Sequence, residues 1–298
     1  MTRGGGAVLA LALISCLLPR SAHAQGAAPG TDSASPRRVE VLPVGYKFTP
    51  LIADPKQPQF QASYLWTNSP VLDPGIGAIG LGETFGLVGQ AGRRPSDGWQ
   101  IDLAGAVFSQ FEIQRESTDL VNADYVVGLP ITYRRGSISG RLMLHHQSSH
   151  LGDEYLLREN AQRLNVSFDG LQLLVSRDIE EWRVYAGGDY VFVHAPEPLQ
   201  DGVFQGGIEY RLHAPLFHAG VRETARLVAA VDLQSWQNVS WQLSWSARAG
   251  VELGPPGPAH QGLGRTWSLL LEAFDGPTPF GQFYTEHISY VGIGLHFR

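Results

Sequence analysis

Residues 239–253 read Val-Ser-Trp-Gln-Leu-Ser-Trp-Ser-Ala-Arg-Ala-Gly-Val-Glu-Leu. The odd-numbered positions carry valine, leucine, alanine and tryptophan, whereas the even-numbered positions carry serine, glutamine, glycine, arginine and glutamate. Successive side chains of a β-strand point to opposite faces, so strict alternation of this kind indicates a strand with one apolar and one polar face. The stretch therefore predicts a single long β-strand.

The same alternation recurs along most of the chain. It runs through residues 99–113, 125–134, 137–148, 182–192, 203–212, 225–234, 266–274 and 288–298, and no aspartate, glutamate, lysine or arginine falls on the apolar face. Strands in soluble proteins typically have about 5–6 residues, whereas a tilted strand that crosses a bilayer needs roughly 9–11. The pattern predicts an all-β fold, a transmembrane antiparallel β-barrel. A soluble barrel or sandwich with long strands is the alternative.

The strand count follows from the spacing of these segments. Counting back from the C-terminus gives eleven strands, near residues 285–297, 264–274, 239–253, 224–235, 202–212, 181–194, 161–176, 137–150, 121–135, 99–113 and 76–90. Residues 60–66 supply a twelfth, and single-chain bacterial barrels favour even numbers. We predict about twelve strands, with ten as the alternative, because Asp169-Gly170 is either a bulge or a hairpin turn. Charges of both signs on the inner face predict a narrow or filled lumen.

The first 24 residues have the features of a signal peptide. Arg3 is followed by the apolar run 7–18 and by Ala22-His23-Ala24, which fits a cleavage site after Ala24. An alternative is lipoprotein processing at Cys16, the only cysteine of the chain. Cleavage after Ala24 leaves a mature chain without a thiol, which excludes disulfides and a cysteine nucleophile. We expect residues 25–59, rich in proline and glycine, to be a periplasmic segment and residues 60–298 to be the barrel.

The composition bears on the partners. The formal net charge is -6 and only two lysines occur, so nucleic acid is not an expected partner. An exported chain with long strands of alternating polarity is typical of the bacterial outer membrane. The lipids of that membrane are then the expected partners. The last nine residues, 290–298, resemble the C-terminal assembly signal of outer-membrane barrels, although Arg298 follows the expected final phenylalanine. This resemblance implies the barrel assembly machinery as a further partner, while the oligomeric state stays open.

One polar segment interrupts an apolar face. Extending the strand parity places His146 and Ser148 together on the lipid face. A histidine and a serine two positions apart on a strand project side by side, as a base and the hydroxyl from which it takes a proton must do. Placing a polar pair against lipid costs free energy, which suggests that the pair has a function. The alternative is that the polar pair has no function and only marks the point at which the strand leaves the membrane.

His146-Gln147-Ser148 resembles the His-Gln-Ser core of outer-membrane phospholipase A and the His-X-Ser of lipid A deacylases. The resemblance implies Ser148 as nucleophile and His146 as base. By position it implies Asn160 as the residue that orients the histidine, with Asn165 as the alternative, or Glu159 if the deacylase pattern applies. The asparagine and glycine that follow the serine in the phospholipase are replaced here by Ser149-His150.

A wider resemblance covers nearly the whole mature chain. Residues 42–60 and 146–154 resemble an uncharacterised bacterial family of exported barrel proteins, known only as a domain of unknown function. This resemblance implies the fold and brings no activity with it.

Three functions follow from these features. The default is an outer-membrane barrel with an unspecified envelope role. The alternatives are a serine lipid hydrolase that uses Ser148 and His146, and a narrow pore or transporter. No cofactor is expected, although imidazoles and carboxylates of this segment could hold a divalent cation such as calcium. The residues that could bind the cation are His145, His146, His150, Asp153 and Glu154. Strand alternation divides them between two faces, and His150, Asp153 and Glu154 are kept as the candidate ligands.

We expect the mature protein to fractionate with outer membranes and to migrate faster on gels before boiling than after it. The physical reason is the charge-free face repeated through strands long enough to cross a bilayer. Recovery as a soluble periplasmic monomer would contradict the barrel.

Overall fold

The computed structural model describes residues 38–94, 96–161, 164–196, 202–219, 223–256 and 264–298. The predicted signal peptide, its predicted cleavage site after Ala24 and Cys16 lie outside these residues. Within the described part of the chain, no helix is both long and apolar enough to cross a membrane.

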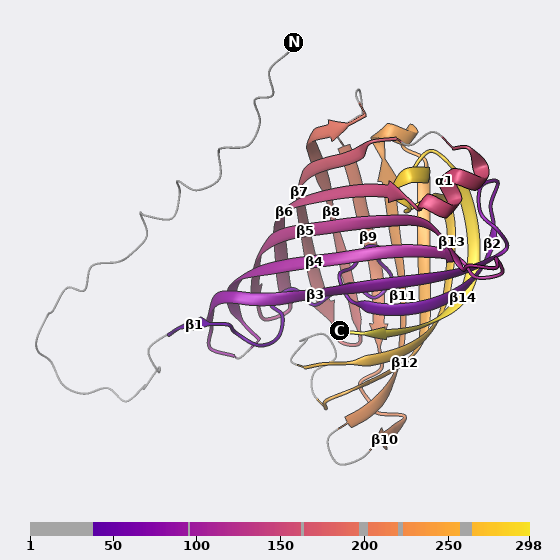
Figure 1. Ribbon diagram of the computed structural model, residues 1–298. Helices are drawn as coiled ribbons and strands as arrows, with labels where there is room; N and C mark the ends of the chain where they lie inside the picture. Colours follow the sequence, from indigo (N-terminus) through magenta and orange to yellow (C-terminus); the bar gives the residue numbers. More distant parts are fainter. Residues whose placement is uncertain (1–37, 95, 162–163, 197–201, 220–222, 257–263) are drawn as a thin grey trace, which may run out of the picture. The chain divides into compact units, whose positions relative to one another are not determined.

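Twelve strands form a closed antiparallel barrel (Figure 1). Of the fourteen strands in the sheet, β1 and β10 lie off the ring, which leaves twelve in the wall. The ring closes because β2 pairs with both β3 and β14, and β3 pairs with β4. The wall strands are β2 (Phe60–Asn68), β3 (Gly75–Ala91), β4 (Gly98–Glu112), β5 (Asp119–Arg135), β6 (Ile138–Leu151), β7 (Val166–Ile179), β8 (Trp182–Ala195), β9 (Gly202–Arg211), β11 (Glu223–Trp236), β12 (Leu243–Gly254), β13 (Trp267–Pro277) and β14 (His287–Phe297).

The predicted all-β barrel and its twelve strands are confirmed, and the ten-strand alternative is wrong. Asp169-Gly170 lies inside β7 rather than in a hairpin turn. It coincides with a register shift against β8, where Phe192 is the extra residue between Val191 and Val193. The extra residue therefore lies on β8, and Asp169-Gly170 continue β7 without a turn.

Short elements mark the two ends of the barrel. The connections at one end carry α1 (Asp153–Glu159) and two 3-10 helices, η1 (Gln237–Val239) and η2 (Gly281–Phe283). We call this the α1 end. Buried apolar residues close part of it, among them Tyr155 of α1 and Phe283 of η2, whose rings meet at 5.5 Å. The opposite end, the terminal end, holds Phe60, Phe297 and two further strands, β1 (Val39–Val41) beside β3 and β10 (Phe217–Ala219) beside β11.

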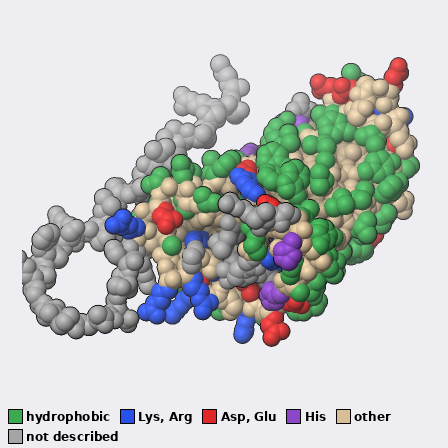
Figure 2. Space-filling view, turned by 90° about the horizontal axis from the view of Figure 1, so that it is seen from below, with side chains coloured by type: hydrophobic (Ala, Val, Ile, Leu, Met, Phe, Trp, Pro, Cys, Tyr) green, Lys and Arg blue, Asp and Glu red, His purple; other side chains and the backbone are tan. Residues whose placement is uncertain are grey.

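The alternation of the sequence becomes an outer and an inner face. On β13, Leu269 and Leu271 are 55% and 67% exposed, whereas Ser268, Leu270 and Glu272 at the alternate positions are buried. Figure 2 shows hydrophobic side chains spread over much of the outer wall on the side in view. Aromatic pairs border it near the terminal end, where the rings of Trp267 and Phe297 lie 4.6 Å apart. Interfacial aromatic girdles of this kind are typical of membrane barrels.

The inner face is charged, and its charges are paired between neighbouring strands of the wall. Arg183 contacts Glu209 at 3.2 Å, and Arg248 contacts Glu272 at 3.1 Å. These four side chains are nearly inaccessible to solvent. An unpaired buried charge would be very costly, so the pairs explain how a small barrel tolerates so many ionisable residues in its interior.

The N-terminal segment differs from the periplasmic prediction. Residues 38–44 are mostly exposed, but residues 46–59 lie inside the barrel, and we call them the plug. Phe48 and Leu51 pack against Leu174 and Tyr185 of the wall. The prediction rested on proline and glycine, which disfavour helix and strand, but an irregular segment can be buried when side chains of another element satisfy its backbone.

The carboxylate of Glu209 connects the plug to two arginines of the wall. It accepts a hydrogen bond from the plug amide of Ile52 and contacts both Arg183 and Arg211. We expect Glu209→Gln to lower the free energy of unfolding by about 3–5 kcal/mol, because the amide leaves buried guanidinium charge uncompensated. The matched control is Glu181→Gln, at a partly exposed turn carboxylate, which should leave the unfolding midpoint close to that of the wild type. Urea titration of the heat-modifiable gel band measures both, and equal midpoints would contradict the prediction.

Candidate active site

The side chains of His146 and Ser148 on strand β6 lie on the outer face of the barrel. Its burial alternates, with His145 and Ser149 facing inward and His146 between them 46% exposed at its side chain. Ser148 lies opposite Tyr125 of β5 on one side and Ser167 of β7 on the other. The two candidate residues therefore share one face, in the half of β6 nearer the α1 end.

Asp169 of β7 is the hydrogen-bond partner of His146. The two residues are directly opposite in the β6–β7 ladder, and the Nδ1 atom of His146 lies 2.6 Å from the Oδ1 atom of Asp169. An ionised carboxylate only accepts hydrogen bonds, so Nδ1 carries the proton and donates it. The neutral ring then presents Nε2 as a lone pair, which is the tautomer that a general base needs.

The bulge in β7 and β8 shapes the surroundings of Asp169. Asp169 pairs with Val193 before the register shift, and Gly170 pairs with Val191 after it. A Cβ atom at Gly170 would stand 2.7 Å from both the Nε2 atom of His145 and a carboxylate oxygen of Asp189. Glycine is needed here because the inward-facing pair His145–Asp189, 2.5 Å apart, packs against the backbone. Two histidine–aspartate pairs thus lie back to back across the wall.

The site is a polar island on an apolar surface. Leu144, Val127 and Val193, which adjoin His146 or Asp169 on the outer face, are each about half exposed. Beside Ser148, the ring of Tyr125 meets the ring of His150 edge-on at 5.7 Å. Asp169 is itself 37% exposed at its side chain. The arrangement puts an imidazole, a carboxylate and a hydroxyl where apolar chains would contact the barrel.

The residues predicted to orient His146 lie elsewhere. Asn160 caps the C-terminus of α1 in a left-handed conformation with φ of 49°, and Glu159 binds Arg158 at 2.8 Å. Asn165 is exposed in the segment that precedes β7. None of the three is bonded to His146 within the described part of the chain. The hydrogen-bond partner of His146 is Asp169 in place of these three residues, and residue spacing missed it because α1 lengthens the connection between β6 and β7.

The proposed metal ligands do not converge. His145 faces the lumen, His150 faces outward, and Asp153 and Glu154 form the first turn of α1. Among the described residues, no group of three or more histidine, cysteine, aspartate or glutamate side chains could hold a metal ion.

The sequence matches one protein-family model, described as "Protein of unknown function (DUF1207)", over residues 15–298. The chain belongs to the DUF1207 family. This agrees with the predicted resemblance to an uncharacterised barrel family. No curated protein matches the sequence.

Solved structures similar to this DUF1207 protein are outer-membrane barrels. The outer membrane phospholipase (OMPLA) dimer of Salmonella typhi with bound calcium is 17% identical, with a TM-score of 0.51, and the match covers 82% of this chain and 94% of that one. Outer membrane phospholipase A of Escherichia coli is 14% identical, with a TM-score of 0.53, over 83% and 94% of the two chains. At these identities the likeness establishes the fold alone.

Proposed function

We propose that this DUF1207 protein is a serine ester hydrolase of the outer membrane that releases acyl groups from membrane lipids. The observation that carries the proposal is the hydrogen bond of 2.6 Å between His146 and Asp169 on the outer face, with Ser148 two residues along the same strand. The proposal includes export by residues 1–24, with removal of that segment after Ala24.

Each member of the proposed triad has a separate role. The Oγ atom of Ser148 attacks the carbonyl carbon of a lipid ester while Nε2 of His146 takes the hydroxyl proton. The imidazolium then gives this proton to the leaving alcohol oxygen, which leaves an acyl group on Ser148. A water molecule, deprotonated by His146, hydrolyses the acyl-enzyme and releases the fatty acid. Asp169 holds the ring in its reactive tautomer and stabilises the imidazolium that forms twice in this cycle.

The reach between nucleophile and base fits strand geometry. Residues at i and i+2 lie about 7 Å apart along a strand and on one face, so a serine hydroxyl and a histidine ring can meet by rotation about their side-chain bonds. Ser148 makes no side-chain hydrogen bond within the described residues, which leaves its hydroxyl available. Catalytic hydrogen bonds are often long before substrate binds and tighten only in the complex.

The position of the triad supports a lipid substrate. Its exposed apolar neighbours, such as Leu144 and Val127, offer a surface for acyl chains, and an ester in the bilayer interface can reach Ser148 without leaving the membrane. The two solved structures compared above are named as outer membrane phospholipases. Phospholipid is therefore the first substrate class to test and lipid A the second.

We expect Ser148→Ala and His146→Ala to reduce acyl release by about 10³-fold or more, because triad members act as a unit. Asp169→Asn should also reduce it strongly, since the tautomer is lost. The matched controls are Ser167→Ala, which removes the hydroxyl directly opposite Ser148, and Asn160→Ala, at the position predicted from spacing. Both should retain wild-type rates. The assay is fatty-acid release from phospholipid and lipid A in mixed micelles, with heat-modifiable migration as the check of folding.

Two outcomes would reject the hydrolase. If folded wild-type protein releases no fatty acid from either substrate, the hydrolase is rejected in favour of a non-enzymatic envelope role. Release that persists in Ser148→Ala would show that another protein or another residue performs the reaction.

A further inference from the structure

A cavity lies inside the barrel at the α1 end. It has a volume of about 90 Å³, and Pro55 and Lys56 of the plug border it on one side. On the other side it is bordered by η1 and by the connection between β13 and β14, where Asn238, Pro277 and Tyr284 are partly exposed. A cavity of about 150 Å³ holds benzene, so this one has room for roughly three or four non-hydrogen atoms.

Asp232 of β11 lines this cavity with a buried carboxylate that has no cationic partner. The residue is 1% exposed. Its carboxylate accepts hydrogen bonds from three neutral groups, the hydroxyl of Tyr185 at 2.6 Å and the side-chain amides of Gln205 and Gln234 at 2.9 Å each. Within the described part of the chain, no basic residue forms an ion pair with it. An ionised carboxylate has about four acceptor positions, so one remains for a further donor.

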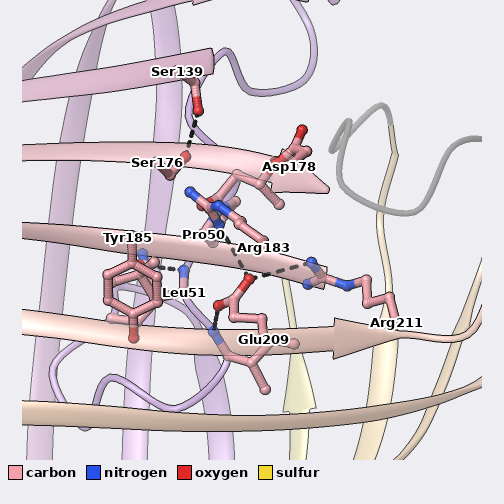
Figure 3. A network of polar contacts seen from close by, with 12 residues as sticks. Pro50, Leu51, Ser139, Ser176, Asp178, Arg183, Tyr185, Glu209 and Arg211 are labelled. Carbon is pink, nitrogen blue, oxygen red and sulfur yellow. Dashed lines mark hydrogen bonds and ion pairs between the residues drawn. The ribbon is translucent and has the colours of Figure 1, made fainter. Parts of the chain in front are cut away.

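Several other inner carboxylates are paired with arginine. Glu209, for example, contacts both Arg183 and Arg211 (Figure 3). A buried carboxylate without a cation is costly, because neutral donors replace only part of its hydration. The charge of Asp232 therefore favours a cation that comes from outside the chain.

The charges around Asp232 add to this preference. The Nε2 atom of Gln234 lies 2.9 Å from Oδ1 of Asp232 and 3.5 Å from Oδ1 of Asp54 in the plug, so two carboxylates flank one amide. Lys56, which also borders the cavity, is already bound to Asp124 of β5. The charge of Asp232 is therefore the one that the lining of the cavity leaves unbalanced.

The other walls of the cavity fit an ammonium group on a short carbon chain. The rings of Phe168 and Trp236 both border the cavity and meet edge-on at 6.0 Å, and aromatic rings attract cations. The Oδ1 atom of Asn238 borders the same space and is buried without a hydrogen-bond partner. An acceptor in this state requires a donor that the chain does not supply. An ammonium group carries three N–H donors and a positive charge, which meets both requirements.

We propose that this cavity binds the ammonium group of a small primary amine, with Asp232 as its counter-ion. Asp232 and Asn238 supply the acceptors for the ammonium group, and Phe168 and Trp236 contact the carbon chain. An amine with more than about four non-hydrogen atoms extends out of the cavity at the α1 end. The site lies on the inner face and shares no residue with the proposed triad, so either proposal can fail without the other.

The test is isothermal titration calorimetry of the full mature chain in detergent, with propylammonium chloride as the probe. Two control probes separate the contributions. 1-Propanol has the same number of non-hydrogen atoms but no charge, and tetramethylammonium chloride is a cation without N–H donors. We expect saturable binding of propylammonium alone. Absence of propylammonium binding, or equal affinity for either control probe, would overturn the proposal.

The variant Asp232→Asn tests the counter-ion. Its affinity for propylammonium should fall by about 10-fold or more, because a hydrogen bond to a charged group is replaced by one to a neutral group. The matched control is Asp102→Asn, at a buried inner carboxylate of β4 that is likewise held by neutral donors, Gln100 and Thr132, but lies outside the cavity. It should keep the wild-type affinity. Equal losses in the two folded variants, or wild-type affinity in Asp232→Asn, would reject the site.

The variant Asn238→Ala keeps the proposal testable if Asp232→Asn fails to fold. Asn238 belongs to η1 rather than to the wall, so its truncation leaves the strand ladder intact. We expect its affinity for propylammonium to fall by about fivefold or more, whereas Gln242→Ala, at an exposed position after η1, should bind like the wild type. Wild-type affinity in folded Asn238→Ala would overturn the assignment. Heat-modifiable migration checks the folding of every variant.

Discussion

Closure of the strand ladder between Phe60 and Phe297 is the constraint on which the rest of the structure depends. A strand exposed to hydrocarbon cannot leave its backbone N–H and C=O groups unpaired, and only a closed ring of strands pairs all of them. Once the ring is closed, each strand has one face outside and one inside. The outer face must then be apolar and the inner face must be filled, so side-chain alternation follows from backbone hydrogen bonding.

Filling a small lumen with charged residues creates a second constraint. Arginines such as Arg183 and Arg248 are buried, so each needs a carboxylate and further acceptors for its remaining N–H groups. The carboxylates come from neighbouring strands, and the plug supplies main-chain oxygens such as those of Thr49 and Ile52. The plug and the charged wall are therefore complementary.

The candidate site uses the opposite face of the same wall. His146 and Asp169 meet because the β6–β7 ladder sets them directly opposite, and the backbone bulge beside Asp169 coincides with the tight packing of His145 and Asp189 on the inside. A side-chain pair mounted on rigid paired strands is positioned by backbone hydrogen bonds rather than by a loop.

The sequence by itself determined the strands, the face that each side chain takes and the shared face of His146 and Ser148, because alternation depends only on local strand geometry. Only the tertiary structure decided that Asp169 rather than Asn160 binds His146. That pairing depends on the register across a connection lengthened by α1, which no residue pattern specifies. The tertiary structure also decided that residues 46–59 lie in the lumen. The wall recognises their backbone, and backbone atoms are the same at every position of a sequence.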